Sequence, residues 1–192
     1  ISSILILVLL ITMSAYFSAT ETAYSSLNKI KLKSIANKGN KKAKLALELS
    51  EKYDSVISTI LIGNNIVNIA TASLATVLFT KLLGSSGVTV STIVMTILIL
   101  IFGEISPKSI AKDIPESFAI VSAPLLNVFC IILKPVNHIF CLWKKLISKV
   151  LKIQKHSGIT EDEILTIAEE AENEGGINPQ QLEIIKSAIE LN

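Results

Sequence analysis

Long apolar runs alternate with short polar segments along this chain of 192 residues. Three of the runs have the length of a membrane-spanning helix, which needs about 20 mostly apolar residues. They predict spans at residues 1–27, 55–83 and 88–111, with Gly84-Ser85-Ser86-Gly87 as a tight turn between the last two. Half of the residues are hydrophobic, which is typical of a membrane protein. The pattern therefore predicts an all-α membrane protein with three crossings.

The polar segment at residues 28–54 carries eight lysines against three acidic residues. Lysine-rich loops stay in the cytoplasm, so we expect the N-terminus outside and the C-terminus inside. Within this segment, residues 41–51 are expected to form an amphipathic surface helix. The lysines can act as a plain topology signal or bind anionic lipid headgroups.

A fourth apolar run, residues 117–143, is interrupted by Pro124 and Pro135 and contains Lys134. Lysines lie on both sides of it, so a further crossing would place the second lysine group outside the cell. We therefore expect a bent helical hairpin that either re-enters the membrane or lies beside it on the cytosolic surface.

The C-terminal part of the chain is acidic and has the pattern of soluble helices. Thr160 and Glu163 form a capping box at the start of one amphipathic helix, and Pro179 opens a second. These features divide the chain into a transmembrane domain, residues 1–156, and a cytoplasmic acidic helical segment, residues 157–192.

Composition excludes several functions. All 18 basic residues are lysine and the net charge is +2, which argues against bidentate phosphate recognition and gives no indication of nucleic acid binding. The two cysteines, Cys130 and Cys141, are expected to be buried thiols rather than a disulfide. No activated nucleophile, paired histidine or phosphate-binding loop is present, so we expect no enzyme.

The end of the third span carries the strongest candidate chemistry. A carboxylate such as Glu104 costs about 2.5–3.5 kcal/mol at the centre of a bilayer, so it is a functional candidate. Pro107 has no N–H and, in an α-helix, leaves the carbonyl four residues back without a donor. That carbonyl belongs to Gly103, so a free oxygen is expected beside the carboxylate.

The first two spans also carry oxygen-bearing side chains. One face of the first span holds Ser14, Ser18, Glu21 and Ser25. The second span contains Asn64, Asn65 and Asn68. Asparagines inside an apolar run need partners, which hydrogen bonds between helices can also supply.

A depth argument brings the three spans together. Helical rise places Ser18, Asn64 and the Gly103 carbonyl all about 14–15 Å from the cytoplasmic ends of their spans. Hydroxyl, amide, carbonyl and carboxylate oxygens favour a hard cation such as Mg²⁺, Ca²⁺ or Na⁺. The small number of charges implies a modest affinity, as a releasing site requires.

Three motifs carry a resemblance to a known family. They are Phe17-Ser18-Ala19-Thr20-Glu21-Thr22-Ala23, Ile62-Gly63-Asn64-Asn65 and Phe102-Gly103-Glu104-Ile105-Ser106-Pro107-Lys108. With them the chain resembles the membrane (DUF21) domain of the CorC/CNNM family of magnesium transport proteins. The acidic segment resembles the helical bundle that links this domain to a pair of nucleotide-binding CBS modules, which the chain does not contain.

The resemblance implies a homodimer in the plasma membrane that holds a dehydrated Mg²⁺ between three helices. It implies Mg²⁺ export coupled to Na⁺ entry, with ATP acting only through the absent CBS modules. The ligands it implies are Ser18, Glu21, Asn64, Gly103 and Glu104, with Ser25, Asn65 and Asn68 as weaker candidates. The alternative hypothesis is a membrane-embedded Mg²⁺ sensor that regulates another transporter.

Overall fold

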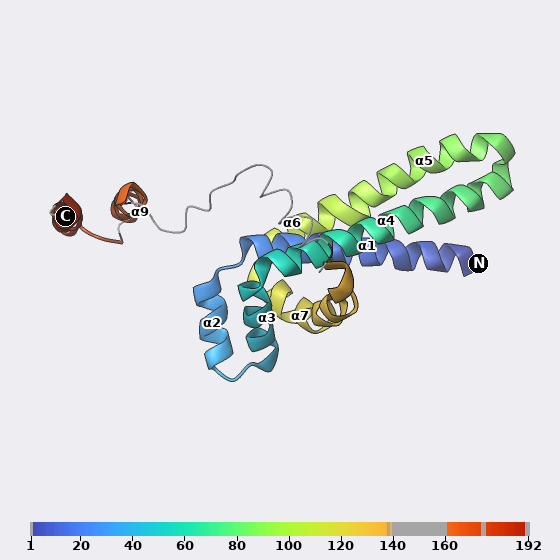
Figure 1. Ribbon diagram of the computed structural model, residues 1–192. Coiled ribbons are helices and arrows are strands. Elements are labelled where there is room, and N and C mark those ends of the chain that lie inside the picture. Colours follow the sequence, from blue (N-terminus) through green and yellow to red (C-terminus); the bar gives the residue numbers. More distant parts are fainter. Residues whose placement is uncertain (1, 138, 140–160, 174–175, 191–192) are drawn as a thin grey trace. The chain divides into compact units, whose positions relative to one another are not determined.

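The computed structural model describes residues 2–137, 139, 161–173 and 176–190, and the secondary structure within them is helical (Figure 1). The contacts divide the chain into two units, Ile1–Lys144 and Lys145–Asn192. The predicted domain boundary between residues 156 and 157 lies outside the described residues. The prediction of an all-α membrane protein is confirmed.

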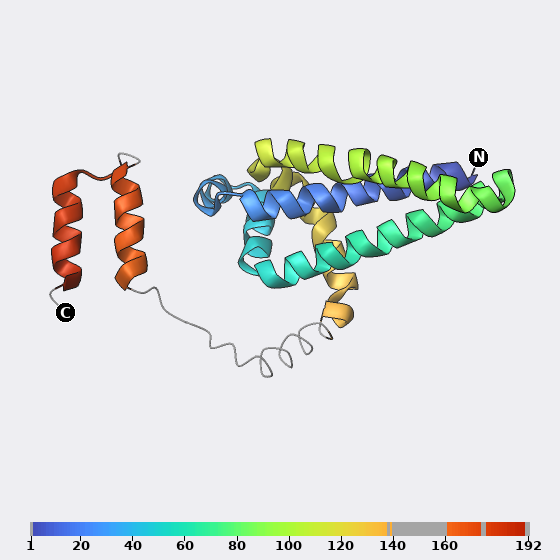
Figure 2. The ribbon, with the colours of Figure 1, turned by 90° about the horizontal axis from the view of Figure 1, so that it is seen from above.

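Three long helical passes form the first unit and match the predicted spans to within two residues at each end. They are α1 (Ser2–Ser26), α4 (Tyr53–Leu83) and a composite pass. The composite pass runs through α5 (Gly87–Leu98), η2 (Ile99–Ile105) and α6 (Ser106–Asp113). Figures 1 and 2 show the three passes side by side, with α1 packed against both others.

Glycines make the turn between α4 and α5 possible. The turn contains the short helix η1 (Gly84–Ser86), where Gly84 has a φ of +67°, a conformation that other residues rarely adopt. A Cβ atom added to Gly87 would collide with the backbone carbonyl of Phe79. The two helices therefore approach most closely where the sequence has no side chain.

Among the described residues, three helical stretches are long and apolar enough to cross a membrane: Ser2–Ser26, Tyr53–Asp113 and Pro115–Ile132. The second reverses at η1 and so contains two of the predicted spans. The third is α7 (Pro115–Ile132), which runs across α1 and α4 in both views rather than alongside them (Figures 1 and 2). This direction favours the predicted membrane-adjacent helix over a fourth crossing. Of the rest of the expected hairpin, residues 134–137 are helical, and most of the residues that follow them lie outside the described part of the chain.

One prediction about this segment is wrong. Pro124 does not interrupt the helix, because α7 continues through it to Ile132. Prolines are tolerated inside helices that pack against neighbours able to satisfy the freed backbone. The helix is held to α1 here, since the Tyr16 hydroxyl donates to the carbonyl of Ser122 at 2.9 Å.

Two short helices connect α1 to α4. The predicted helix at residues 41–51 is α3 (Lys41–Glu51), whereas α2 (Lys29–Asn37) was not predicted. Asparagine side chains cap the N-termini of both, Asn28 on α2 and Asn40 on α3. Buried Leu32 from α2 joins the core, which reaches α7 through α3.

The second unit contains α9 (Glu161–Asn173) and α10 (Pro179–Glu190), in agreement with the two predicted helices. The expected cap at Thr160 lies outside the described residues. At the start of α10, Asn178 and Gln181 exchange backbone-to-side-chain hydrogen bonds of 2.8 and 2.9 Å, which is a capping box. An ion pair of 2.7 Å between Lys186 and Glu169 joins the two helices.

Candidate functional site

A group of polar side chains lies at the middle of the helical bundle. Ser14 is twelve residues from either end of α1, and Asn68 is fifteen residues from either end of α4. With Asn64 and Glu104 they form a connected set, called the polar cluster below. Such side chains at the middle of apolar helices are costly unless they have partners or a function.

Ser14 is the centre of the polar cluster. Its hydroxyl is completely buried and lies 2.7 Å from Asn68 Oδ1 and 3.2 Å from Asn64 Oδ1. A serine hydroxyl has one proton, so it donates to only one of these amide oxygens at a time. Three oxygen atoms therefore share a single proton, which makes this point attractive to a cation.

The third helix contributes a carboxylate. Asn68 Nδ2 donates to Glu104 Oε1 at 3.3 Å, and this contact directs the oxygen of the same amide toward Ser14. Among the described residues, Glu104 has no lysine partner. Its negative charge at the middle of the bundle is therefore balanced only by an amide donor.

Glu104 lies in a π-helical turn, η2, a conformation in which an N–H donates to the carbonyl five residues back rather than four. Ser106 N–H accordingly donates to the carbonyl of Ile101. In this register the carbonyl left without a donor by Pro107 belongs to Phe102. The prediction that Pro107 itself frees the Gly103 carbonyl assumed an α-helical register and needs this correction.

The return to α-helical register frees a further oxygen. Ser106 donates to Ile101, Pro107 has no N–H, and an α-helical register in α6 pairs Ser109 with Ile105, so only Lys108 is left to offer an N–H to the carbonyls of residues 102, 103 and 104. Two of these three carbonyls have no backbone donor within the helix. Gly103 stays a candidate ligand for this reason, although the cause differs from the one predicted.

Gly103 also lets the helices approach closely. A Cβ atom at this position would lie 3.0 Å from Ser14 Oγ, closer than almost all real contacts. A second glycine does the same between α1 and α4, where a Cβ on Gly63 would lie 2.5 Å from the ring of Phe17. The ring of Phe17 also packs against Phe129 of α7 at 4.9 Å between centroids. These contacts fix the register in which Ser14 meets the two asparagines.

Ser18 is buried one turn beyond Ser14, with no exposed surface. Its hydroxyl has no hydrogen-bond partner in the part of the chain that the structure describes. A buried polar group without a partner destabilises the fold by about 1–3 kcal/mol. Such a group in a native protein is therefore explained either by tolerated strain or by a ligand that binds to it. Ser18 therefore stays a candidate ligand.

The structure does not bring the other predicted residues into the polar cluster. Glu21 lies two turns from Ser14 and forms an ion pair of 3.1 Å with Lys108. The Ser25 hydroxyl contacts the Tyr53 hydroxyl at 3.1 Å. Exposed Asn65 donates to the Leu61 carbonyl of its own helix at 2.8 Å.

The clearest omission from the predicted ligands is Ser14, although it was placed on the same helical face as Ser18. Helical spacing identifies a face but not which turn of it meets the next helix. Asn68, a weaker candidate, has a central position because it bridges α1 and η2. Its position four residues after Asn64 was the available signal.

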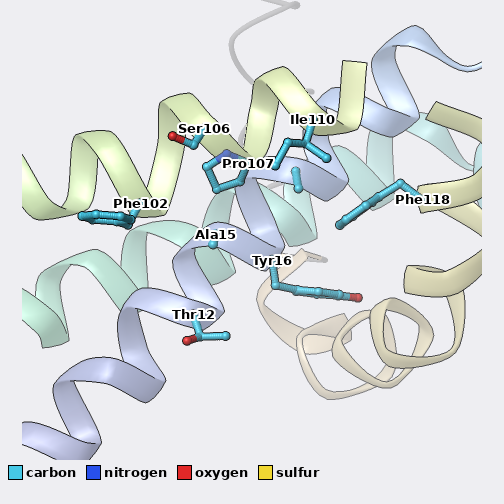
Figure 3. A pocket seen from close by; sticks show the side chains of 9 residues that line it. Thr12, Ala15, Tyr16, Phe102, Ser106, Pro107, Ile110 and Phe118 are labelled. Atoms are coloured by element: carbon cyan, nitrogen blue, oxygen red, sulfur yellow. The ribbon is translucent and has the colours of Figure 1, made fainter. Parts of the chain in front are cut away.

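Behind the π-turn lies an apolar cavity of about 450 Å³ (Figure 3). It is bounded by Thr12, Ala15, Tyr16 and Ala19 of α1, by Phe102, Ser106, Pro107 and Ile110, and by Phe118 of α7. Phe102 of η2 and Pro107 of α6 point into it (Figure 3). The π-turn thus has a polar, closely packed side and an apolar side with free space.

Comparison with known proteins identifies the family. The model of the cyclin M transmembrane N-terminal domain matches residues 5–181. The chain belongs to this family. Cyclin M domains are membrane domains of the transporter type, in agreement with the helical bundle.

Relatives of this cyclin M domain include two bacterial UPF0053 proteins. A UPF0053 protein of Haemophilus influenzae is 35% identical over 191 residues, which cover 97% of this chain and 45% of the relative. The UPF0053 inner membrane protein YfjD of Escherichia coli is 33% identical over 182 residues, or 93% of this chain and 42% of the relative. The chain spans less than half the length of these relatives.

A more distant relative has a functional name. The polyamine export protein of Escherichia coli is 26% identical over 206 residues, which cover the whole of this chain and 46% of that protein. The comparisons together support a multi-pass membrane protein of a transport family.

Proposed function

We propose that this cyclin M domain carries Mg²⁺ across the membrane through the polar cluster, as an exporter coupled to Na⁺ entry. The observation that supports this most strongly is the sharing of one hydroxyl proton among Ser14, Asn64 and Asn68. A cation bound there satisfies the oxygen lone pairs that the protein itself leaves without donors. No carboxylate-rich cage is needed.

The charge of the site suits transport. In the described residues no group of three His, Cys, Asp or Glu side chains is placed to hold a metal ion. The cation instead meets neutral oxygens and the single carboxylate of Glu104. A site that binds through dipoles and one charge can release its ion, whereas a cage of carboxylates retains it.

The oxygen ligands of the site are of the chemical type that Mg²⁺ prefers. Mg²⁺ takes oxygen ligands in octahedral geometry and gives up its water reluctantly, so a dehydrated ion needs oxygen ligands from the protein. The amide oxygens of Asn64 and Asn68, the Ser18 hydroxyl and a freed carbonyl such as that of Gly103 are of this type. Glu21 is assigned a supporting role only, because Lys108 already neutralises it.

Transport requires two arrangements of the helices around the site. The apolar cavity lies between α1, η2, α6 and α7 and gives Pro107 free space beside it (Figure 3). A shift of Pro107 within that space would change the close approach of Gly103 to Ser14 and so alter access to the site. This is the motion that we propose for release.

A second candidate is export of an organic polycation. It is favoured by the name of the 26% identical relative, the polyamine export protein of Escherichia coli. Ammonium groups donate to amide and carboxylate oxygens, so the same polar cluster can accept them. Competition between spermidine and Mg²⁺ for the purified protein separates the two cargoes.

The test is cation flux into proteoliposomes that contain the complete protein, with and without a Na⁺ gradient. Asn68→Ala removes a member of the polar cluster. Asn65→Ala is its matched control, since Asn65 is an exposed asparagine on the same helix. We expect Na⁺-dependent Mg²⁺ flux that Asn68→Ala abolishes and Asn65→Ala preserves.

Two other outcomes of this flux experiment would support a different function. Spermidine flux in place of Mg²⁺ flux supports the second candidate. Mg²⁺ binding without any flux supports the alternative of a membrane-embedded sensor.

The proposal also includes the membrane setting. We propose a homodimer in the plasma membrane, with the N-terminus outside and the C-terminus in the cytoplasm, and with ATP acting only through modules beyond this chain.

A further inference from the structure

A second cavity lies between α4 and α5, on the side of the polar cluster toward the Gly84 turn. It has a volume of about 100 Å³ and is lined by four hydroxyl-bearing side chains, Thr76, Ser91, Thr92 and Thr96, together with the apolar Ala72, Met95 and Ile99. About three waters fit in such a volume at roughly 30 Å³ each. The surrounding helices are otherwise strongly apolar.

The cavity lies further along helix faces that also carry members of the polar cluster. On α4, Asn68, Ala72 and Thr76 follow one another at intervals of four residues and so share one face. On the other pass, Thr92 and Thr96 lie on the face that leads to Gly103 in η2. Thr76 is eight residues from Asn68, about 12 Å along the helix axis.

The hydroxyls of this cavity are arranged as acceptors. Thr76 Oγ1 donates to the Ala72 carbonyl at 2.9 Å, and Thr92 Oγ1 donates to the Val88 carbonyl at 2.9 Å. Ser91 Oγ also donates to the Val88 carbonyl at 2.9 Å and lies 3.3 Å from Thr76 Oγ1. With their protons directed to carbonyls, the oxygen lone pairs remain available to water or a cation.

We propose that this cavity is a hydrated release site for the transported cation. The cation would enter it from the polar cluster and leave it on the side of the membrane where the Gly84 turn lies. The inference rests on the proposed function and adds the route of exit. Mg²⁺ gives up its water reluctantly, so a dehydrated ion leaving the polar cluster needs oxygen partners before it reaches bulk water. The hydroxyls of Thr76 and Thr96, with a few waters, supply them.

The first test measures water access and does not depend on transport. Cysteine is introduced singly at Thr76 or Thr96, which line the cavity, with the two native cysteines replaced by serine. Val77→Cys and Ile97→Cys are matched controls, because each is the exposed next residue outside the cavity. A membrane-impermeant thiol reagent is applied from the side of the Gly84 turn.

We expect the two cavity cysteines to react at least about tenfold faster than the controls, because the reactive thiolate needs water around it. Equally slow labelling at all four positions would mean that lipid or dry packing fills the cavity. That result overturns the inference, whatever the protein transports.

The second test separates exit from binding. The triple variant Thr76→Val/Thr92→Val/Thr96→Val removes three hydroxyls and keeps the side-chain shape. Thr80→Val/Thr89→Val is the control, since both threonines lie on the same helices outside the cavity lining. We expect Mg²⁺ flux in the triple variant to fall about tenfold, with Mg²⁺ protection against thermal unfolding retained.

The outcomes distinguish the two proposals. Flux that needs Asn68 but is unaffected by the triple variant leaves the proposed function standing and overturns the release site. Loss of Mg²⁺ protection in the triple variant would make these hydroxyls part of the binding site itself, which also contradicts an exit role. Absence of flux in the unmodified protein counts against the proposed function, and the labelling result then decides on the cavity alone.

Discussion

Two carboxylates of the bundle, Glu104 and Glu21, have opposite surroundings. Glu104, at the middle of the bundle, is contacted by the amide of Asn68 at 3.3 Å. Glu21, two turns further along α1 from Ser14, forms an ion pair of 3.1 Å with Lys108. Lys108 neutralises the charge of Glu21, whereas no lysine among the described residues neutralises Glu104. The carboxylate of Glu104 is therefore available to a bound cation.

Glu116 shows the same arrangement as Glu21 at another place. Its side chain is 10% exposed and accepts from Lys31 Nζ at 2.9 Å and from the backbone N–H of Asn28 at 3.1 Å. These contacts fasten the start of α7 to the start of α2. A lysine-paired carboxylate thus has a structural role here, whereas an amide-paired carboxylate at mid-bundle is suited to bind cargo.

The largest effect is expected from removing the charge of Glu104. Contacts to a charged group are worth about 1.5–3 kcal/mol, so Glu104→Gln is expected to weaken Mg²⁺ binding by about ten- to a hundredfold. Glu21→Gln, the matched change at the paired carboxylate, is expected to leave affinity nearly unchanged. Titration of Mg²⁺ protection against thermal unfolding measures both, and equal losses would remove the distinction.

The next effect concerns the register that creates the polar cluster. Gly63→Ala places a methyl group 2.5 Å from the ring of Phe17, so the ring or helix α4 must shift. Overpacking of this kind costs about 1–3 kcal/mol, and Mg²⁺ protection is expected to fall with stability. Phe17→Leu in the Gly63→Ala background makes room and is expected to restore both. Failure of this rescue would show that the close contact does not set the register.

A smaller effect is expected at the Glu116 contact. Lys31→Met leaves a largely buried carboxylate with only its backbone donor, but Lys31 itself is 65% exposed, so the cost is reduced to about 1 kcal/mol. Thermal unfolding should occur at lower temperature while Mg²⁺ affinity stays constant. Lys33→Met, an exposed neighbour on α2, is the control. A loss of affinity with Lys31→Met would couple this contact to the cation site.

The smallest effect is expected at the Glu21 ion pair, whose side chains are 42% exposed for Lys108 and 28% for Glu21. Exposed pairs contribute about 0–1 kcal/mol, so Lys108→Met should hardly change thermal unfolding. The informative measurement on Lys108→Met is the Mg²⁺ affinity. If freeing Glu21 from Lys108 strengthens Mg²⁺ binding markedly, Glu21 is a ligand in another state of the protein.

The sequence predicted the spans and much of the site because both follow from strong local signals. Apolar length defines α1, α4 and α5, and the depth of Asn64 and Gly103 follows from helical rise. Ser18 was identified in the same way, and the structure shows its hydroxyl buried without a partner among the described residues.

What the sequence did not predict depends on contacts between helices. Ser14 lies at the centre of the polar cluster because Phe17 packs onto Gly63. This contact sets the register of α1 against α4. The π-turn at η2 changes which carbonyl Pro107 frees, and no residue pattern in one helix predicts that register. Pro124 was expected to interrupt α7, but neighbouring helices hold α7 together.

The central claim is that the cation binds between Ser14, Asn68 and Glu104. Its most direct test is anomalous X-ray scattering from crystals of the complete protein grown with Mn²⁺, an oxygen-binding ion of the same charge as Mg²⁺. The account predicts one anomalous peak within coordination distance of Glu104 and an Asn68 or Asn64 oxygen. A peak beside Glu21 and Lys108 instead, with none at Glu104, would contradict it.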